Sequence, residues 1–306
     1  MFESRGRIHV HFSIPFYAGD QLIRTLRPIA LSLRKTGVSI PDPQKYREVF
    51  SRKVRGAEGG VFMPLEVERM SETLDESAEL LVLSFNDFMS APSDIFAGGV
   101  IYGEAHHRIE YLRNLFPNRE MTLFFSAANP GAVMAAMLNS GAMNGDRAEK
   151  LAHIRPLWSE LTERIDLFHP DLPVILWANE DTPVTWPAIL REVLDLPENS
   201  AVHGGLHMAG AVLDGRARED LGSRISKDLP KSELQMMRLL SVFLWDNVDR
   251  SRTEFEVDHA GWDQETIDDF TLIYEQDLDS CLDLEQVTVI TLETMIDDRK
   301  EELVDA

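Results

Sequence analysis

Cysteine is almost absent from this sequence, since Cys281 is the single residue of its kind among 306. One cysteine cannot form a disulfide within the chain, and Cys281 belongs to no spacing typical of a metal site. The pattern is typical of a reducing compartment, so we expect a cytoplasmic protein. We expect Cys281 to be a small buried side chain on a helix.

Long apolar runs are also missing. The longest, such as residues 131–138, are far shorter than the roughly 20 residues that cross a bilayer. The first seven residues are polar and charged and do not lead into the apolar segment of a secretory signal. We therefore expect no insertion into a membrane.

Basic residues are few, because 30 Lys and Arg stand against 52 Asp and Glu and give a formal net charge of −22. Residues 253–306 hold 18 of the acidic and 2 of the basic residues, a net of −16, which leaves −6 for the rest. Nucleic acids and anionic membranes are disfavoured as partners, because both need clustered cations. The acidic segment predicts a solvated helix face and tail, with a docking surface for a basic partner as the alternative.

No linker or repeat divides the chain, so we expect a single domain over residues 1–306 with an acidic, mostly helical region at 253–306. Short apolar runs alternate with helical patterns. One such run follows Arg7, and the others cover residues 79–85, 121–126 and 173–177. Such alternation predicts an α/β fold, a three-layer, mostly parallel sheet with helices on both faces and a helical C-terminal part.

Prolines predict where helices break. Pro28 should bend or split the helix that begins at Gln21, and Pro156 should bend or break the helical stretch 147–168, because proline removes a helical hydrogen bond. Further helices are expected at 44–55 and 65–74. Towards the end of the chain, Met236, Met237 and the aromatic cluster 243–245 are expected to pack in the core.

Polar residues follow the predicted strands. The carboxyl ends of parallel strands meet at one edge of a sheet, where ligands of such folds bind, so these residues are expected to converge on one cleft. The loop after the first strand would direct backbone N–H groups and a helix N-terminus at an anion, yet it contains an acid and no lysine. The residues at these strand ends are Asp20, Asn86, Asp87, Ala128, Asn129, Glu180 and Asp181.

In this order, these pieces resemble the sulfotransferase-like branch of P-loop nucleotide-binding proteins, in particular bacterial sulfotransferase-related proteins. In that family a His/Pro-Lys-Thr-Ala/Gly-Thr-Thr loop grips the 5′-phosphosulfate end of 3′-phosphoadenosine 5′-phosphosulfate. Residues 14–22 match it at Pro15, Ala18 and Leu22, but the family's lysine falls on Phe16 and its hydroxyl residues on Gly19 and Asp20. The resemblance implies a P-loop fold with donor-binding positions at Tyr17, Ala18, Gly19, Asp20, Gln21, Ala128 and Asn129.

Two further motifs match in part. Residues 126–130 resemble a strand ending in Arg-Asn/Asp-Pro that binds the donor's 3′-phosphate, with Ala128 in place of the arginine. Residues 84–87 resemble a Ser-x-Glu-Asn/Asp motif, with Asn86 in place of the glutamate. Residues 176–183 match a Trp-x-Asn-Glu-Asp-Thr-Pro segment more faithfully, and the resemblance extends from about Ile8 to Ile290.

The first hypothesis is a sulfotransferase-like pseudoenzyme. Sulfuryl transfer develops negative charge that cations and hydroxyl donors must stabilise, and the positions Phe16, Asp20 and Asn86 are degenerate in this respect. A carboxylate at Asp20 would repel a phosphate by roughly a few kcal/mol. The chain then binds no cofactor and acts as a binding or scaffold protein for an unknown protein or small-molecule partner.

Two enzymatic alternatives stay open. In a divergent transferase, Glu180 and Asp181 together with Asp20 and Asp87 would hold Mg²⁺ or Mn²⁺, although Asp20, Glu180 and Asp181 are also interpreted as helix caps. In an active sulfotransferase, cations would come from elsewhere in the chain. Candidates for this role near the loop are His9, His11, Arg5 and Arg24, and the pairs His106–His107 and His203–His207 are either surface residues or ligands.

Overall fold

The computed structural model describes residues 6–16, 19–55, 74–75, 77–197, 200, 202–250 and 264–296. The chain divides into two compact units, Met1–Leu176 with Val257–Val289 and Trp177–Glu256 with Ile290–Ala306. The expectation of a single domain stays a prediction. Two compact units can belong to one domain, or they can be two separate domains. No helix in the described ranges has the length and apolarity that a membrane span requires.

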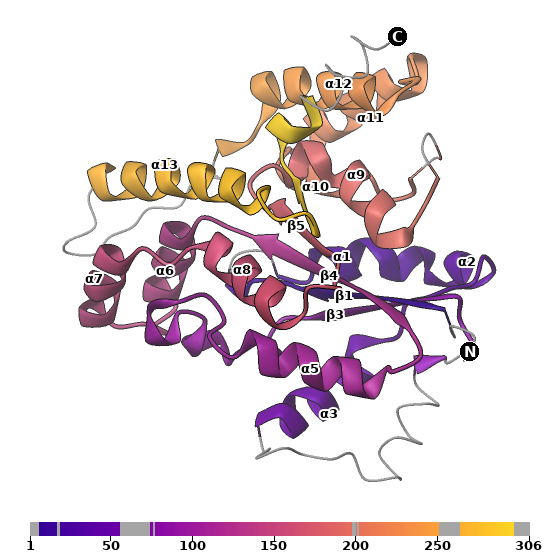
Figure 1. Cartoon of the computed structure of the whole chain (residues 1–306). Coiled ribbons are helices and arrows are strands. Elements are labelled where there is room, and N and C mark those ends of the chain that lie inside the picture. The colour runs from indigo at the N-terminus through magenta and orange to yellow at the C-terminus, as the bar shows by residue number, and fades with distance from the viewer. Residues whose placement is uncertain are drawn as a thin grey trace. The chain divides into compact units, whose positions relative to one another are not determined.

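The first unit is built on a parallel sheet with helices packed on it, which confirms the predicted α/β fold (Figure 1). In the described part of the chain the sheet has six strands in the order β2-β3-β1-β4-β5-β6. In β1, Arg7 lies opposite Leu80 and Glu120, and the register continues to Phe12. The strands are β1 (Arg7–Phe12), β2 (Val38–Ser39), β3 (Leu80–Phe85), β4 (Glu120–Ala127), β5 (Val174–Ala178) and β6 (Val287–Ile290).

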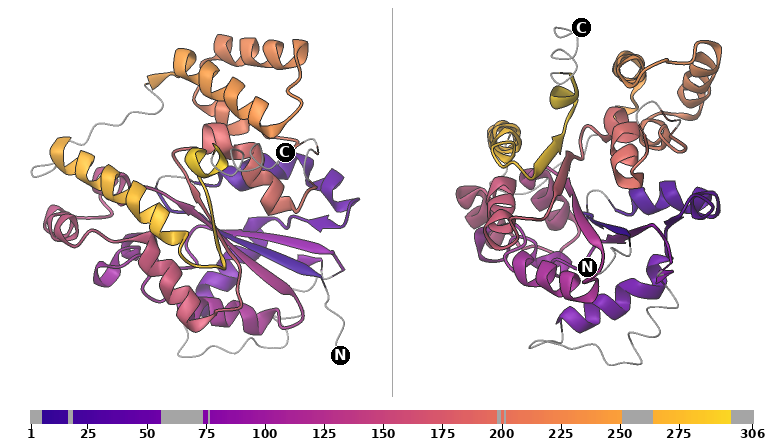
Figure 2. Two further views of the ribbon diagram at one scale, coloured as in Figure 1. Left: turned by 45° about the horizontal axis from the view of Figure 1, so that its top comes forward. Right: turned by 45° about the vertical axis from the view of Figure 1, so that its right-hand side comes forward.

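This strand order places a topological switch point at β1. From β1 the chain runs to β2 and β3 on one side and then crosses β1 to reach β4 on the other. Right-handed crossovers therefore put the helices of the first connection on the opposite face from those of the next two. Figures 1 and 2 show this arrangement, with α1 and α2 on one face and α3 and α5 on the other. The loop after β1 lies where sheets of this kind bind ligands.

The helices of the first unit confirm the effect of the prolines. Pro28 splits the first helix and Pro156 separates α7 from α8, as predicted. The helix expected at 65–74 lies outside the described residues apart from Leu74. The bounds are α1 (Gln21–Leu26), η1 (Arg27–Ile29), α2 (Ala30–Arg34), α3 (Pro43–Arg55), η2 (Pro92–Asp94), η3 (Ala97–Gly99), α5 (Ala105–Leu115), α6 (Pro130–Asn139), α7 (Gly145–Ile154), α8 (Trp158–Phe168) and α13 (Gln264–Cys281).

An aromatic cluster packs beneath the loop at the carboxyl ends of the strands. The ring of Phe12 lies 5.1 Å from that of Phe125 and 6.1 Å from that of Phe85. Tyr46 and Phe50 of α3 contact Phe85 edge-on or tilted, each at 5.4 Å. Because these rings join α3 to the ends of three strands, residues on α3 are held close to the loop.

Helix α13 has an apolar face and an acidic one, as predicted for this region. Phe270, Tyr274, Leu278 and Cys281 are buried at helical spacing, while most of the acidic residues are exposed. The exception is Asp277, which is buried.

The second unit is helical in the part that the structure describes, with α9 (Thr182–Leu194), α10 (His207–Ala211), α11 (Gly215–Lys227) and α12 (Glu233–Asn247). Met237, Phe243 and Leu244 are buried, as predicted, and Met236 is half-buried against the same cluster. Trp245 is 87% exposed, so the prediction that it packs in the core is wrong. The reason is helical geometry, because Trp245 is turned by about 200° from the buried Phe243.

Candidate functional site

The loop that follows β1 is anchored to both neighbouring strands. The Ser13 backbone N–H donates to the carbonyl of Phe85 at 2.8 Å, and the Ile14 N–H donates to the hydroxyl of Ser126 at 3.2 Å. The Ser13 hydroxyl donates to the Gly19 carbonyl at 2.8 Å, which closes the loop on itself. The start of the loop is therefore held in place by β3 and β4.

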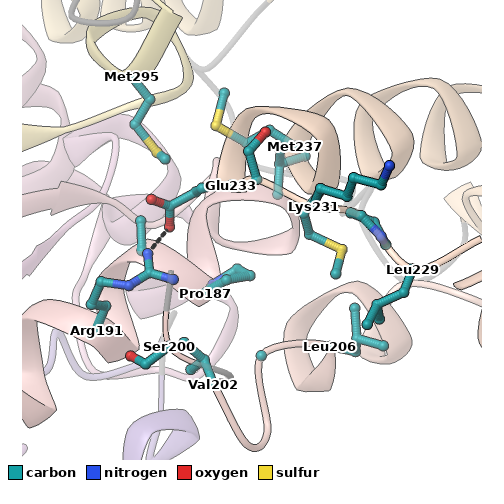
Figure 3. A pocket seen from close by; sticks show the side chains of 16 residues that line it. Pro187, Arg191, Ser200, Val202, Leu206, Leu229, Lys231, Glu233, Met237 and Met295 are labelled. Carbon is teal, nitrogen blue, oxygen red and sulfur yellow. Dashed lines mark hydrogen bonds and ion pairs between the residues drawn. The ribbon is translucent and has the colours of Figure 1, made fainter. Parts of the chain in front are cut away.

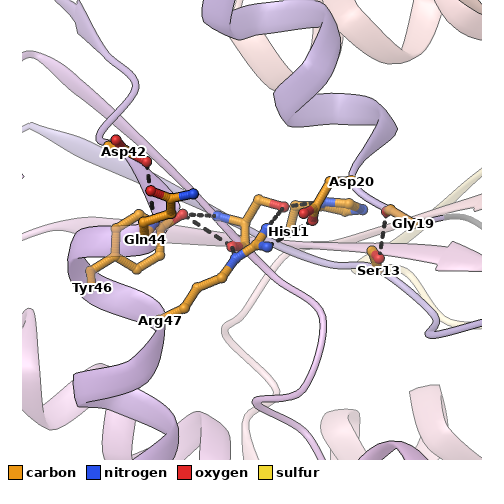
Figure 4. Close-up of polar contacts among 9 residues, drawn as sticks. His11, Ser13, Gly19, Asp20, Asp42, Gln44, Tyr46 and Arg47 are labelled. Carbon is orange, nitrogen blue, oxygen red and sulfur yellow. Dashed lines mark hydrogen bonds and ion pairs between the residues drawn. The ribbon is translucent and has the colours of Figure 1, made fainter.

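Asp20 ends this loop and forms an ion pair with Arg47 of α3, with 2.7 Å between Oδ1 and Nη1 (Figure 4). Asp20 occupies the N-cap position of α1, but its side chain makes no capping hydrogen bond. The interpretation of Asp20 as a helix cap is therefore wrong, because its carboxylate binds a guanidinium from another helix instead.

Arg47 is fixed by β3 as well as by Asp20. Its Nε donates to the Ser84 carbonyl at 2.6 Å and its Nη2 donates to the Ser84 hydroxyl at 3.2 Å. The side chain of Arg47 is 13% exposed and that of Asp20 is 36% exposed. The residues of the loop itself include no cation, but Arg47 lies beside it. The guanidinium of Arg47 donates to Asp20 of the loop and to Ser84 of β3.

Sequence reasoning missed Arg47, which follows Asp20 by 27 residues. The local signal is weak: Tyr46 and Phe50 are spaced as the buried face of a helix, and Arg47 borders that face. Asp42 marks where α3 begins, because its carboxylate accepts a hydrogen bond from the Gln44 N–H at 3.2 Å. Nothing local indicates that the helix packs beside the loop.

Tyr46 explains how α3 is fastened to the sheet. The two-residue strand β2 pairs with β3 at Leu80 and Leu81, and no other described strand lies along this edge of β3 beyond them. The Tyr46 hydroxyl donates to the Ser84 carbonyl at 3.0 Å and accepts from the Ser84 N–H at 2.9 Å. A side chain thus satisfies both buried backbone groups and holds α3 at the end of β3.

His11 lies behind the same serine, with 3.0 Å between its Nδ1 and the Ser84 hydroxyl oxygen. Burial, with Arg47 as a second cause, lowers the pKa of His11 to about 3. At neutral pH this imidazole is uncharged and supplies no cation to the loop.

The depressed pKa of His11 predicts a loss of stability in acid. Between pH 6.5 and about 3 the unfolded chain protonates His11 while the folded chain does not. The free energy of unfolding should therefore fall by up to about 1.4 kcal/mol for each pH unit in this window, and should be independent of His11 above it. Urea unfolding of the wild type and His11→Asn across this range measures the difference. Parallel stability curves for the two proteins would contradict the prediction.

The two predicted donor-binding residues after β4 contact neighbouring helices. Ala128 is fully buried and its carbonyl accepts from the Trp158 indole N–H at 3.0 Å. Asn129 caps α6, accepting from the Gly131 N–H at 2.9 Å, and donates to the Thr271 hydroxyl of α13 at 3.1 Å. These contacts join β4 to α6, α8 and α13.

The other predicted positions of the loop are partly described. Phe16 is 41% exposed with a positive φ of 67°, and Gly19 also has a positive φ, of 56°. Gln21 begins α1, and its carbonyl accepts from the Thr25 hydroxyl at 2.9 Å. Tyr17 and Ala18 lie outside the described residues. In the loop after β3, Asn86 and Asp87 are half-buried.

Glu180 and Asp181 belong to the second unit. The Asp181 carboxylate accepts from the Leu292 N–H at 2.7 Å, which caps the helical turn at 292–296, and burial raises the pKa of Asp181. The cap that Asp181 was expected to provide for α9 is not made by its side chain. Glu180 is exposed.

The metal alternative receives no support from the described residues. Among them, no three His, Cys, Asp or Glu side chains gather as a metal site would require. Asp20 is paired with Arg47, and Asp181 with a backbone N–H. His207 opens α10 while His203 lies in the preceding turn, so these two exposed histidines do not share a helix.

Comparisons with models of protein families, with curated proteins and with solved structures find no match for this chain. What the loop binds must therefore be argued from its own residues. There Arg47 of α3 faces Asp20 of the loop, at the switch point of a parallel sheet.

Proposed function

We propose that this chain is a sulfotransferase-like protein that has lost donor binding and sulfuryl transfer and acts as a binding or scaffold protein. Its motifs resemble that family in order and spacing, and the loop that would hold the donor follows the central strand of a parallel sheet. That place suits an anion-binding loop in an α/β fold.

One observation carries the proposal, the ion pair between Asp20 and Arg47. Arg47 brings to the loop the positive charge that Phe16 lacks, but the carboxylate of Asp20 neutralises it within the molecule. A phosphosulfate would have to displace this carboxylate from a contact of 2.7 Å and would then be repelled by it. The described pair therefore offers an incoming anion no net attraction.

Calorimetric titration with adenosine 3′,5′-bisphosphate tests this proposal. We expect no binding to the wild type and measurable binding to Asp20→Asn, in which a neutral group of the same shape releases Arg47. Asp42→Asn is the matched control, because Asp42 pairs with Arg27 outside the loop and its side chain is 29% exposed, close to the 36% of Asp20. Micromolar binding by the wild type would overturn the proposal.

A second candidate function, an active sulfotransferase, is favoured by the way Arg47 is held. Its bonds to Ser84 do not involve Asp20, so the guanidinium can stay at the loop while a donor replaces the carboxylate. Incubation with labelled 3′-phosphoadenosine 5′-phosphosulfate and a panel of phenols and alcohols separates the two functions. Turnover that Arg47→Met abolishes would establish the enzyme, and no turnover supports the binding protein.

We also propose a cytoplasmic location and a basic partner for the acidic C-terminal region. The support is that Cys281 is buried as a reduced thiol that donates to the Asp277 carbonyl, and that the acidic side chains of α13 are mostly exposed. Cross-linking in lysate at low and high salt tests the proposal of a basic partner, since an electrostatic contact weakens as salt rises.

A further inference from the structure

The second unit contains a cavity of about 330 Å³ between α9, α12 and the segments beside α10 (Figure 3). This volume lies within the range of small-molecule sites, roughly 300–1,000 Å³. Most of the lining is apolar, and the residues that matter below are Ala188, Leu206, Leu229, Met236, Met237 and Met295. A small organic molecule fits a space of this size and polarity.

One side of the cavity is charged. Arg191 of α9 forms an ion pair with Glu233 at the start of α12, and the two side chains are only 12% and 14% exposed. Figure 3 shows this pair on one side of the cavity and Leu206 and Leu229 on the opposite side. The lining therefore suits a ligand with a polar head and an apolar body.

The donors left on Arg191 favour an anionic head. The charged residues of the lining are Arg191, Lys231 and Glu233, and Glu192, which follows Arg191 on α9, interacts electrostatically with both members of the ion pair. A guanidinium has five N–H donors, and Glu233 is bound through the Nη1 of Arg191. The Arg191 Nη2 makes no hydrogen bond with a described residue and stays accessible, whereas the Nε, also without a partner among the described residues, is buried beyond the reach of a ligand. Arg191 thus keeps donors for a carboxylate, the group that a guanidinium matches best.

The apolar part of the lining is adaptable. Met236, Met237 and Met295 have flexible, polarizable side chains that accept apolar bodies of different shape. We propose that this cavity binds an organic monocarboxylate with an apolar body, its carboxylate on Arg191 and its body toward Leu206 and Leu229. This inference concerns a second site, and it does not depend on the function proposed for the loop after β1.

Calorimetry on the full chain with decanoate, decanol and decylamine tests the chemistry of the ligand. We expect decanoate to bind at least tenfold more tightly than decanol, because only the acid pairs with Arg191, and decylamine to bind most weakly. Equal binding of decanoate and decanol, or tighter binding of decylamine, would overturn the proposal. Adenosine 3′,5′-bisphosphate on the same protein reports on the loop, so the two proposals fail independently.

Two variants locate the site. Ala188→Phe fills the cavity from α9 and should weaken decanoate binding at least tenfold, while Val242→Phe adds the same ring on the exposed side of α12 and should leave binding unchanged. The double variant Arg191→Met with Glu233→Met replaces the ion pair by apolar groups of similar size, a replacement that often leaves the stability of a protein unchanged. This variant should bind decanoate and decanol with equal affinity. Unchanged decanoate affinity in Ala188→Phe, with its circular dichroism intact, would overturn the assignment.

Discussion

Replacing Arg47 by methionine is expected to lower the free energy of unfolding by about 2–3 kcal/mol, because charged hydrogen bonds to buried groups are lost. The change removes the donors to the Ser84 carbonyl and hydroxyl and leaves the Asp20 carboxylate without its guanidinium. The Asp20 contact itself adds little, since that side chain is 36% exposed and screened by solvent. Most of the loss comes from the buried contacts to β3.

Urea unfolding followed by tryptophan fluorescence measures this effect. Arg27→Met is the matched control, because Arg27 pairs with Asp42 at 3.5 Å and its side chain is 64% exposed. We expect the control to change stability by less than about 0.5 kcal/mol. If Arg47→Met is no more destabilised than the control, then Arg47 does not hold the loop and α3 together, and the proposed neutralisation of the loop loses its structural basis.

Replacing Asp277 by alanine is expected to have a similar or larger effect, a loss of about 3 kcal/mol, because two buried N–H groups lose a charged acceptor. The Asp277 carboxylate accepts from the Trp158 N–H at 2.6 Å and from the Ser159 N–H at 3.1 Å. Leu157, at the N-cap of α8, makes no side-chain capping bond, so α13 supplies this cap across the fold. Helix N-termini leave such donors unsatisfied unless an acceptor is provided.

Asp279→Ala, two residues along the same helix and exposed, is the control for Asp277→Ala. It removes the same charge from α13 without touching α8, so its stability should stay within about 0.5 kcal/mol of the wild type. The stability of Asp277→Asn should lie between those of Asp277→Ala and Asp279→Ala, because an amide keeps one acceptor oxygen. Equal stabilities for Asp277→Ala and Asp279→Ala would show that α8 needs no cap from α13.

The predictable parts of the fold follow from short-range rules. Pro28 and Pro156 break helices because of their own covalent geometry, and the apolar run before Phe85 becomes a strand because both faces of a parallel sheet are covered. The same rules place Asp20 and Asn86 at strand ends. They do not say which side chain lies opposite Asp20, and they misplaced Trp245, whose exposure depends on the face by which α12 packs.

The candidate site was predictable only as a location. The loop after β1, and the absence of a cation within it, could be recognised from the order of the residues alone. Arg47 could not be recognised, because it reaches the loop through the packing of Tyr46 and Phe50 against the sheet. The cavity beside Arg191 was equally hidden, since its walls come from α9, α12 and the turn at 292–296.

By itself, the amino-acid sequence determined the strands, the helix breaks, the acidic character of the C-terminal region and the place of the loop after the first strand. Only the tertiary structure decided that Arg47 neutralises Asp20, that Asp277 caps α8 and that Arg191 and Glu233 meet at a cavity. The physical reason is range. Periodicity, proline geometry and turn chemistry act over a few residues, whereas Asp277 and Trp158 are separated by 119 residues and meet only when α13 packs on α8.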